Sequence, residues 1–521
     1  TLAMAPPSLA QGLVLEEVIV TAQKREESLQ DVPISVTALD GAKLADAGIQ
    51  KIEELSAYIP NFNMTESAVG NTVFIRGIGS GINQGFDQSV GMFIDGIYAG
   101  RSQQFRTPFL DVAMVEVLKG PQGTLFGKNT IAGAINITTA KPTDEFTGDF
   151  SVLYEPEYET AEVVGVISGA LADRLAGRLA VKYRESDGYI DNLVSGETEP
   201  EREEQTIRAS LLWTPGDNLD VLIKGETGSF DVTGRAVQVS NLNGIFIVPG
   251  LINQTLAPLV DAREDGRIDD NRTAASYTPE ATDTENDVLV ITANYDLGEY
   301  MLTAITGYSG YEFEELTDAD FTDLTFTQQD IYQDFKQYSQ EIRLTSPLSD
   351  HFEYILGAYW QEQELENQGR IDFDLAAAGL TTLPSLSTYR VFEQDATTYA
   401  LFGQGTWHLT SDWHLTLGLR WTREEKEAQQ SLVVAEFGET TASMDPALAL
   451  LAFRVAGSDA HVYDQDRSAS DTSPSLTLTW DMNIDTMLYA RVAQGFKSGG
   501  YNEAENSGVS ERFEFDDEEA V

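Results

Sequence analysis

The 521-residue sequence contains no cysteine, so neither a disulfide framework nor a thiolate metal site is available to it. It also lacks any run of 18 apolar residues, which excludes a membrane-spanning helix but not a membrane barrel, whose alternating strands leave only a weak hydropathy signal. Basic residues are few: 33 Lys and Arg stand against 84 Asp and Glu, a formal net charge of −51. This balance excludes nucleic-acid binding, which depends on cationic groups that displace counterions.

Motifs of common hydrolases are missing as well. The sequence has no Gly-x-Ser-x-Gly elbow, no His-Glu-x-x-His helix and no cysteine nucleophile. Carboxylates are so abundant that any two of them resemble a general acid and base, so their presence carries no information. We therefore expect no catalytic residue, no cofactor and no metal site.

The first ten residues have the small-residue pattern that precedes signal-peptidase cleavage, with Ser8-Leu9-Ala10 before Gln11 as the expected cut. The charged start and most of the apolar core of such a signal are missing. We therefore expect residues 1–10 to be the remnant of an export signal. Residues 11–27 then form a short segment that contains the β-prone run Glu16–Ala22.

The segment Val115–Asn136 carries the densest pattern in the sequence, and it predicts a strand, a turn, a glycine-punctuated loop and a second strand. A phosphate-binding loop is excluded, because Gln122 stands where its first glycine belongs and Asn129 replaces its magnesium-binding hydroxyl. The simplest alternative is a hairpin of an ordinary β domain, with glycine wherever the backbone needs positive φ or a close approach.

This segment resembles the plug signature of TonB-dependent outer-membrane receptors. The resemblance rests on Gly120, Pro121, Gly123, Gly127, Asn129, Gly133 and Asn136. Two further segments, Asn71–Gly79 and Val90–Tyr98, resemble other plug motifs in the order the family shows. The resemblance implies an α+β plug over residues 28–142. Its local pattern predicts a strand at Pro33–Leu39, a helical turn at Gly41–Ala47 and a short helix at Ile52–Tyr58.

The β-prone run before the plug resembles the TonB box, the extended peptide that adds as a strand to the energy-transducing partner. Its residues are Glu17, Val18, Ile19, Val20, Thr21 and Ala22. On local pattern alone an ordinary first strand fits equally well. Position favours the box, because only about half a dozen residues separate it from the expected cleavage site, which leaves no room for the signalling domain of some receptors.

In the family, basic plug residues pair with acids of the barrel, and Arg76 and Lys119 occupy such positions. Lys119 replaces the more usual arginine and so lacks the bidentate fork of a guanidinium group. We expect Glu341 to be its partner on the barrel.

Residues 143–521 alternate with a period of two. In Arg178–Arg184, Ser339–Leu344 and His414–Thr422, apolar side chains that would face lipid alternate with polar ones that would face the lumen. A soluble sandwich alternates in the same way, so connection lengths decide. Tight links alternate with long ones, as in a bacterial outer-membrane barrel. Thirteen strands are predicted, near residues 146–156, 159–170, 173–187, 203–215, 217–231, 285–297, 299–313, 334–347, 351–368, 392–409, 412–427, 467–481 and 484–498.

The fold class that follows is an antiparallel membrane β-barrel with an N-terminal α+β plug in its lumen. Aromatic residues near strand ends fit an interfacial girdle: Tyr183, Trp213, Tyr295, Trp407, Trp421 and Trp480. A plugged lumen belongs to 22-stranded transporters, so beside the 13 strands predicted here about nine are missing. The barrel at 143–521 is therefore expected to be incomplete at its C-terminus. Gln494–Asn502 resembles a motif that the family carries around strand thirteen.

The resemblance implies TonB-dependent active transport of a scarce ligand across the bacterial outer membrane. A ferric siderophore is the first expectation, and haem, cobalamin or a glycan is the alternative. Haem is disfavoured, because only one of the four histidines, His461, lies in a long loop. A surface-adhesion or structural barrel without energy coupling is the alternative of another class, and it would carry neither box nor plug.

The expected ligand surface comprises the long loops and the plug apices near residues 68–71 and 80–88. Expected partners are a TonB-type energy-transducing inner-membrane protein, outer-membrane lipid and lipopolysaccharide, and a small extracellular ligand. The acid-rich loop at residues 261–270 suggests either a calcium site or, more simply, a solvated surface.

Overall fold

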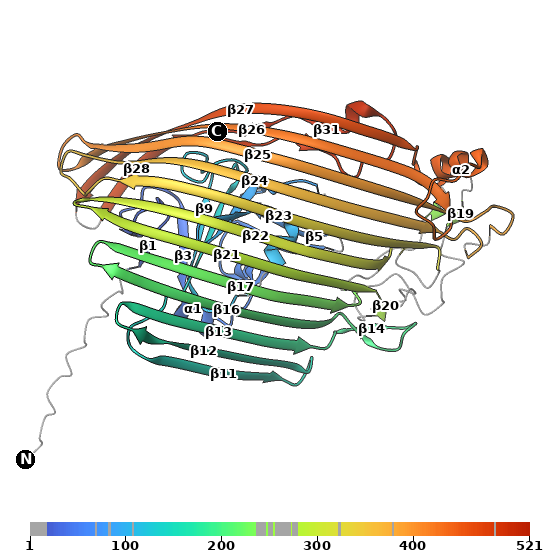
Figure 1. The fold of residues 1–521 in the computed structure, drawn as a ribbon, viewed down its shortest axis with the longest axis horizontal. Helices are drawn as coiled ribbons and strands as arrows, with labels where there is room; N and C mark the ends of the chain where they lie inside the picture. The colour runs from blue at the N-terminus through green and yellow to red at the C-terminus, as the bar shows by residue number, and fades with distance from the viewer. Residues whose placement is uncertain are drawn as a thin grey trace, which may run out of the picture.

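The computed structural model describes residues 18–67, 70–81, 85–106, 109–235, 246–247, 254–255, 272–273, 280–320, 325–377, 380–483 and 486–521. Long antiparallel strands form a curved wall, and a smaller α+β unit sits inside its concave face (Figure 1). The export-signal remnant at 1–10 and the acid-rich loop at 261–270 lie outside the described residues.

The smaller unit is the plug. Its elements are β3 (Val36–Asp40), α1 (Gly41–Asp46), η1 (Ile52–Ala57), β4 (Phe62–Ser67), β5 (Gly70–Ile75), β6 (Ile78–Gly79), β7 (Val90–Ile94), β8 (Ile97–Ala99), η2 (Ser102–Arg106), β9 (Val112–Lys119) and β10 (Gly133–Thr139). One sheet has the order β3-β9-β10-β7-β8, with β10 and β7 parallel, and a second has the order β4-β5-β6. The predicted helix at Ile52–Tyr58 is a 3-10 helix.

Alternating apolar residues build the plug core. Val115, Val117 and Ile135 are fully buried and pack with Ile52 and Leu55 of η1. The first helix begins where sequence chemistry places it, because the Asp40 side chain accepts a hydrogen bond from the Lys43 backbone N–H. The plug is therefore a packed body with its own core.

In the described part of the chain, thirteen strands form the wall in sequence order. They are β11 (Thr147–Glu155), β12 (Thr160–Ala172), β13 (Leu175–Ser186), β16 (Glu201–Gly216), β17 (Leu219–Thr233), β21 (Ala281–Leu297), β22 (Tyr300–Asp318), β23 (Thr327–Thr345), β24 (Phe352–Phe373), β25 (Leu386–His408), β26 (Trp413–Glu436), β27 (His461–Asn483) and β28 (Thr486–Ala493). Each strand pairs antiparallel with the next. Short links gather on one rim, at the left in Figure 1, and the longest links on the other.

Smaller elements occupy the ends and the long links. They are β1 (Ile19–Val20), β2 (Glu27–Ser28), β14 (Ile190–Asn192), β15 (Thr198–Glu199), β18 (Phe246–Ile247), β19 (Gln254–Thr255), β20 (Arg272–Thr273), α2 (Pro446–Ala456), β29 (Gly495–Lys497), β30 (Gly500–Tyr501), η4 (Ser510–Arg512), β31 (Glu514–Phe515) and β32 (Glu518–Ala520). Among the residues described, no helix is both long and apolar enough to cross a membrane.

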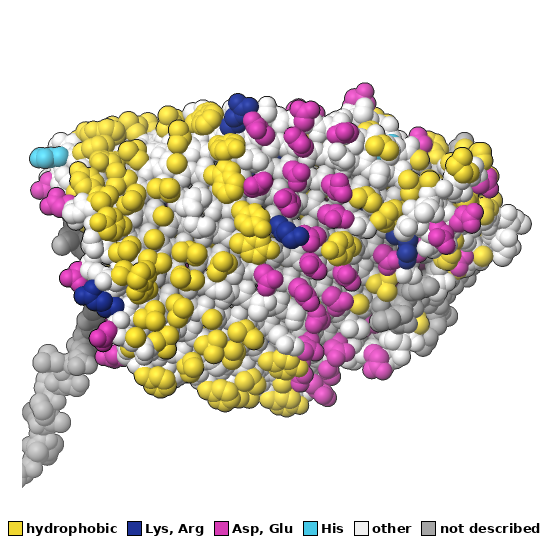
Figure 2. Space-filling model, in the orientation of Figure 1, with side chains coloured by type: hydrophobic (Ala, Val, Ile, Leu, Met, Phe, Trp, Pro, Cys, Tyr) yellow, Lys and Arg dark blue, Asp and Glu magenta, His cyan; other side chains and the backbone are white. Residues whose placement is uncertain are grey.

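The wall turns its apolar side chains outward. On β26, Leu419 and Trp421 are 54% and 42% exposed, whereas the alternate residues Arg420 and Thr422 are buried against the interior. Figure 2 shows the result as an apolar band nearest the short-turn rim. Members of this band include Leu179, Ile207, Leu211, Trp213, Ile223, Leu289, Ile342, Leu356, Leu401, Leu417, Leu419, Trp421, Leu476 and Leu478. A water-soluble sandwich would bury this face, so the arrangement fits a lipid-facing surface.

Beyond the apolar band the same outward positions become acidic, which Figure 2 shows as a magenta zone. Members of this acidic belt include Glu203, Asp283, Glu285, Asp287, Glu312, Glu314, Glu362, Glu364, Glu393, Asp395, Glu425, Glu427, Asp464 and Asp466. The belt explains the main error in the predicted strands, which end too early on this side. The prediction stopped near residue 427, whereas β26 continues to Glu436. Polar residues on both faces look like a loop in sequence, although the hydrogen-bonded pairing continues.

Candidate functional site

The loop between β9 and β10 packs directly against the concave face of the wall. A Cβ atom on Gly123 would lie 2.8 Å from the Gln494 carbonyl oxygen, and one on Gly127, whose φ is +91°, would lie 2.9 Å from the Arg420 guanidinium carbon. At Gly133, where φ is +153°, a Cβ atom would lie 2.2 Å from a β9 carbonyl oxygen. The close approach of neighbouring backbone and side chains therefore explains these signature glycines.

Asn129 ties this loop to the segment that follows β28. Its Nδ2 donates to Asp87 Oδ2 at 2.8 Å and to Tyr98 Oη at 3.0 Å, both within the plug. Its Oδ1 accepts from the Ser498 backbone N–H at 2.9 Å, and its own N–H donates to the Phe496 carbonyl at 2.8 Å. The two sequence motifs, one in the plug and one after β28, therefore contact each other at this asparagine.

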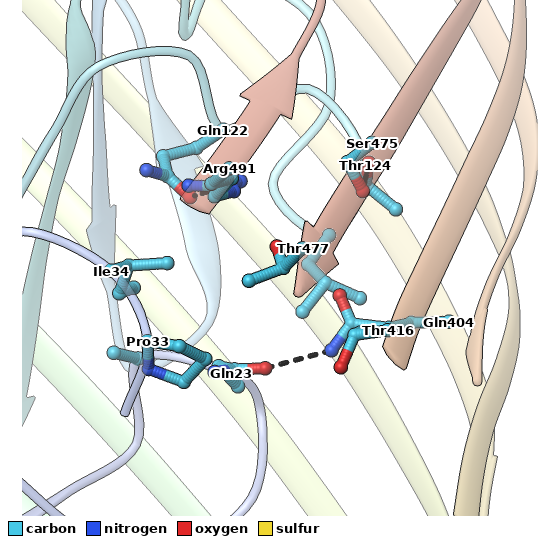
Figure 3. A pocket seen from close by; sticks show the side chains of 12 residues that line it. Gln23, Pro33, Ile34, Gln122, Thr124, Gln404, Thr416, Ser475, Thr477 and Arg491 are labelled. Carbon is cyan, nitrogen blue, oxygen red and sulfur yellow. Dashed lines mark hydrogen bonds between the residues drawn. The ribbon is translucent and has the colours of Figure 1, made fainter. Parts of the chain in front are cut away.

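A small pocket lies where the N-terminal segment, the plug loop and the wall meet (Figure 3). Gln404 Nε2 of the wall donates to Gln23 Oε1 at 2.8 Å across one side of it. On the plug side, the Pro121 carbonyl accepts from Arg491 Nη2 at 3.3 Å. Gly120, with φ +91°, begins the loop and donates its N–H to a plug carbonyl. Polar groups of the three parts thus converge on one small space.

The N-terminal segment, residues 18–28, is docked against the plug as a small hairpin in which β1 pairs antiparallel with β2. Val20 and Ala22 are only 1% and 2% exposed. The Val18 carbonyl accepts from the Leu29 N–H at 2.8 Å. Of the predicted box residues, Ile19 and Val20 therefore form a short strand, with Val20 and Ala22 buried and Ile19 exposed, while Glu17 lies outside the described residues.

One buried carboxylate holds this segment to β9. Glu116 is fully buried, and its Oε1 accepts from the Thr21 backbone N–H at 2.6 Å. Its Oε2 accepts from the Thr21 hydroxyl at 2.9 Å and from Asn136 Nδ2 at 2.5 Å. Glu116 is not among the predicted site residues, although a lone acid inside the apolar run Val115–Leu118 is a readable signal of a buried polar contact.

Two cations next to the box bind carboxylates on the wall. Lys24 Nζ lies 2.5 Å from Glu341 Oε2, and Arg25 Nη1 lies 2.9 Å from Glu353 Oε2. Arg343 completes the first group, with its Nη1 2.9 Å from Glu341 Oε1. Burial lowers the pKa of Lys24 to about 8, although Glu341 opposes that shift. The N-terminal segment is thereby fastened to the wall as well as to the plug.

The expected pairing of Lys119 with Glu341 is wrong. Lys119 Nζ donates to the Pro60 carbonyl at 2.9 Å, and Arg76 Nη2 donates to Ser35 Oγ at 3.1 Å, so both contacts stay within the plug. Partial burial and the neighbouring Arg76 lower the pKa of Lys119. The physical reason is that Lys24 and Arg343 already occupy Glu341, whereas Arg76 and Lys119 bind plug atoms at the exposed edge of the plug.

Elsewhere the sign of the plug–wall pairs is reversed. Asp111 of the plug accepts from Arg178 Nε at 2.6 Å and from its Nη2 at 2.5 Å. Asp95 forms a close ion pair with Lys224 of β17. Burial alone would raise the pKa of Asp95, but Lys224 holds it below its usual value. In these ion pairs the wall thus contributes basic residues from β13 and β17, whereas it contributes acidic residues from β23 and β24.

A third group of charges is buried between the plug and the middle of the wall. Lys128, next to the signature asparagine, forms a close ion pair with Glu424 of β26, which also lies 3.1 Å from Lys426 Nζ. In the plug, Asp87 lies 3.4 Å from Arg101 Nε and 3.8 Å from Lys128 Nζ. Burial alone would raise the pKa of Asp87, but Arg101 and Lys128 lower it. Nothing in the sequence spacing predicted this network.

A curved wall that is apolar outside and polar inside, and that holds a separate plug with a docked N-terminal strand against its concave face, defines the plugged receptors of the bacterial outer membrane. The chain belongs to the TonB-dependent receptor family. The family described as "TonB dependent receptor-like, beta-barrel" matches residues 216–514, and the "TonB-dependent Receptor Plug Domain" matches residues 28–134. The predicted fold class and the outer-membrane location are thereby confirmed.

Named relatives match nearly the whole chain. The pesticin receptor of Yersinia pestis is 23% identical over 514 residues, which are 94% of this chain and 65% of that protein. The crystal structure of the ferric yersiniabactin uptake receptor of Yersinia pestis superposes with a TM-score of 0.74 at 19% identity and covers 94% of this chain and 68% of that one. The crystal structure of a siderophore receptor of Acinetobacter baumannii superposes with a TM-score of 0.69 at 15% identity. This superposition covers 95% of this chain and 69% of that one. The chain thus spans about two thirds of the length of these proteins.

Proposed function

We propose that the protein serves TonB-dependent uptake of a ferric siderophore across the bacterial outer membrane. The observation that carries this proposal is the docked segment Val18–Ala22, which contains the short strand β1, is held by Glu116 and is fastened to the wall through Lys24 and Arg25. A strand of this kind is suited to pairing with an edge strand of a partner. The names of the relatives, which are pesticin, ferric yersiniabactin and siderophore receptors, favour the siderophore class of cargo.

In the proposed cycle, a ligand binds at the long-link rim and the box leaves its docked position. A TonB-type inner-membrane partner then adds the box to its own sheet and pulls on the plug. Three groups of contacts must break for this to happen: those of Thr21 with Glu116, of Lys24 with Glu341, and of Arg25 with Glu353. Each is a charged contact in a partly or fully buried place, so the docked state resists release until force or ligand acts.

The histidines of this chain do not favour haem as cargo. His461 begins β27 beside a long link, but its Nδ1 lies 2.7 Å from the Asp459 carbonyl oxygen and its Nε2 lies 3.2 Å from Gln430 Oε1. Both ring nitrogens are therefore engaged. The other three histidines lie at the opposite, short-turn rim, far from the expected entry side.

The apolar band is proposed to lie in the bilayer, with the acidic belt beyond it at the level of lipid headgroups and lipopolysaccharide. Leu401 and Asp395 illustrate the boundary, because both project outward from β25 only six residues apart. An apolar side chain is suited to hydrocarbon and a carboxylate to water. The strands therefore continue above the membrane with their pairing intact.

Growth on defined ligands tests the proposal. Cells that carry the full gene and lack other receptors are supplied with ferric siderophores, haem, cobalamin or glycans as the limiting source. Val20→Pro removes a backbone donor from the box and fixes its φ, whereas Val20→Thr keeps the strand and is the matched control. Siderophore-dependent growth that fails only in the proline variant supports the proposal, and unchanged growth of that variant removes the energy-coupling claim.

A further inference from the structure

Two histidines face each other at the short-turn rim, where β25 ends and β26 begins. His408 and His414 are direct partners in the antiparallel register. Their Nδ1 atoms are 2.6 Å apart, and their ring planes meet at 77°. Their side chains are 20% and 18% exposed, so the pair is held in place yet reachable from solvent.

A carboxylate binds the other nitrogen of each ring. His408 Nε2 lies 3.1 Å from Glu353 Oε1, and His414 Nε2 lies 2.8 Å from Asp481 Oδ2. Glu353 also pairs with Arg25. An ionised carboxylate only accepts hydrogen bonds, so each Nε2 must carry the hydrogen. A neutral imidazole has a single N–H, and the two Nδ1 lone pairs therefore point at each other.

Two lone pairs at this distance repel unless a cation lies between them. We propose that His408 and His414 bind a borderline divalent transition metal, Zn²⁺ or Cu²⁺, through their Nδ1 atoms. Imidazole nitrogen suits these ions. The carboxylates behind the rings match the arrangement that fixes the tautomer of metal-binding histidines. A tetrahedral ion with Zn–N bonds of 2.0–2.1 Å would place the nitrogens about 3.3 Å apart, so the two rings have to separate and also tilt until both Nδ1 lone pairs point at the ion.

Water completes the coordination. In the part of the chain that the structure describes, no group of three or more His, Cys, Asp or Glu side chains is placed to hold a metal ion. The remaining positions therefore face solvent at the rim. The metal takes the place of any proton held between the two rings. Through Glu353 the site lies one ion pair away from Arg25 and the N-terminal segment.

Metal binding to the full chain in detergent tests this proposal. The metal-stripped protein is dialysed to equilibrium against Zn²⁺, and Cu²⁺ is added in a second series read by electron paramagnetic resonance. We expect one Zn²⁺ equivalent and a two-nitrogen Cu²⁺ signature. Either His408→Gln or His414→Gln should weaken Zn²⁺ binding at least tenfold, and Asp481→Asn should weaken it about tenfold or more. His351→Gln and His461→Gln are the matched controls and should leave both readings unchanged.

Two results would overturn the proposal. The first is an unchanged Zn²⁺ affinity in His414→Gln, which would place any bound metal elsewhere. The second is the lack of a stoichiometric Zn²⁺ equivalent in the parent protein, which would mean that a proton alone occupies the space between the rings.

Discussion

Replacing Glu116 by glutamine should release the N-terminal segment from the plug. The carboxylate accepts three hydrogen bonds from donors, two from Thr21 and one from Asn136. An amide brings its own N–H₂ group to one of these positions, so at least one donor then faces another donor. A hydrogen bond to a charged group contributes about 1.5–3 kcal/mol. The undocked fraction should therefore rise by about ten- to a hundredfold.

The assay uses the absence of cysteine from the chain. Val20→Cys places a single thiol at a position that is 1% exposed, and its maleimide labelling rate then reports the undocked fraction. Adding Glu116→Gln should accelerate labelling by the factor above, while adding Glu26→Gln, an exposed neighbour, should not. Equal rates with and without Glu116→Gln would refute the role given to this carboxylate. If Val20→Cys alone were labelled as fast as Glu26→Cys, whose thiol is exposed, the docking of the segment itself would be refuted.

Three further outcomes are expected. Burial raises the pKa of Glu27 from 4.5 to about 7, so docking is strongest below about pH 4.5 and weakens as pH rises to 7. The labelling rate of Val20→Cys, normalised to that of an exposed thiol, should therefore increase over this pH range. Glu27→Gln should abolish this increase. A double-mutant cycle of Lys24→Gln and Glu341→Gln should give a coupling of about 1–3 kcal/mol in thermal unfolding, and additive effects would contradict the ion pair. In lipid, Leu401→Arg should cost about 2–4 kcal/mol of folding free energy and Asp395→Arg less than about 1 kcal/mol. Equal losses of folding free energy in the two variants would contradict the proposed position of the apolar band in the bilayer.

The wall was predictable because lipid and lumen impose opposite demands on alternate residues. Leu417, Leu419 and Trp421 face outward while Arg420 and Thr422 face inward, and this period survives in sequence without any knowledge of contacts. The strand ends were not predictable, because above the apolar band both faces are polar. The sequence signal for pairing disappears there, although the pairing itself continues.

The ion-pair partners that are far apart in the sequence could not be predicted for a different reason. Lys119, Arg76 and Lys24 are all cations near the start of the chain, and only the folded backbone determines that Lys24 reaches Glu341. Local chemistry was more informative. The signature glycines predicted places where neighbouring atoms approach the backbone closely, and the structure shows such an approach at Gly123. Helix α2 was missed in a long link even though its Asp445 cap and terminal Gly457, with φ +66°, were readable signals.

The central claim is that segment 18–28 is the handle through which energy reaches the plug. The most direct measurement compares binding and uptake of a radiolabelled ferric siderophore by energised cells that carry the full gene, with Val20→Pro against Val20→Thr. Retained binding with uptake lost only in the proline variant is the result that this account predicts. Uptake by the proline variant at the rate of the control would contradict it.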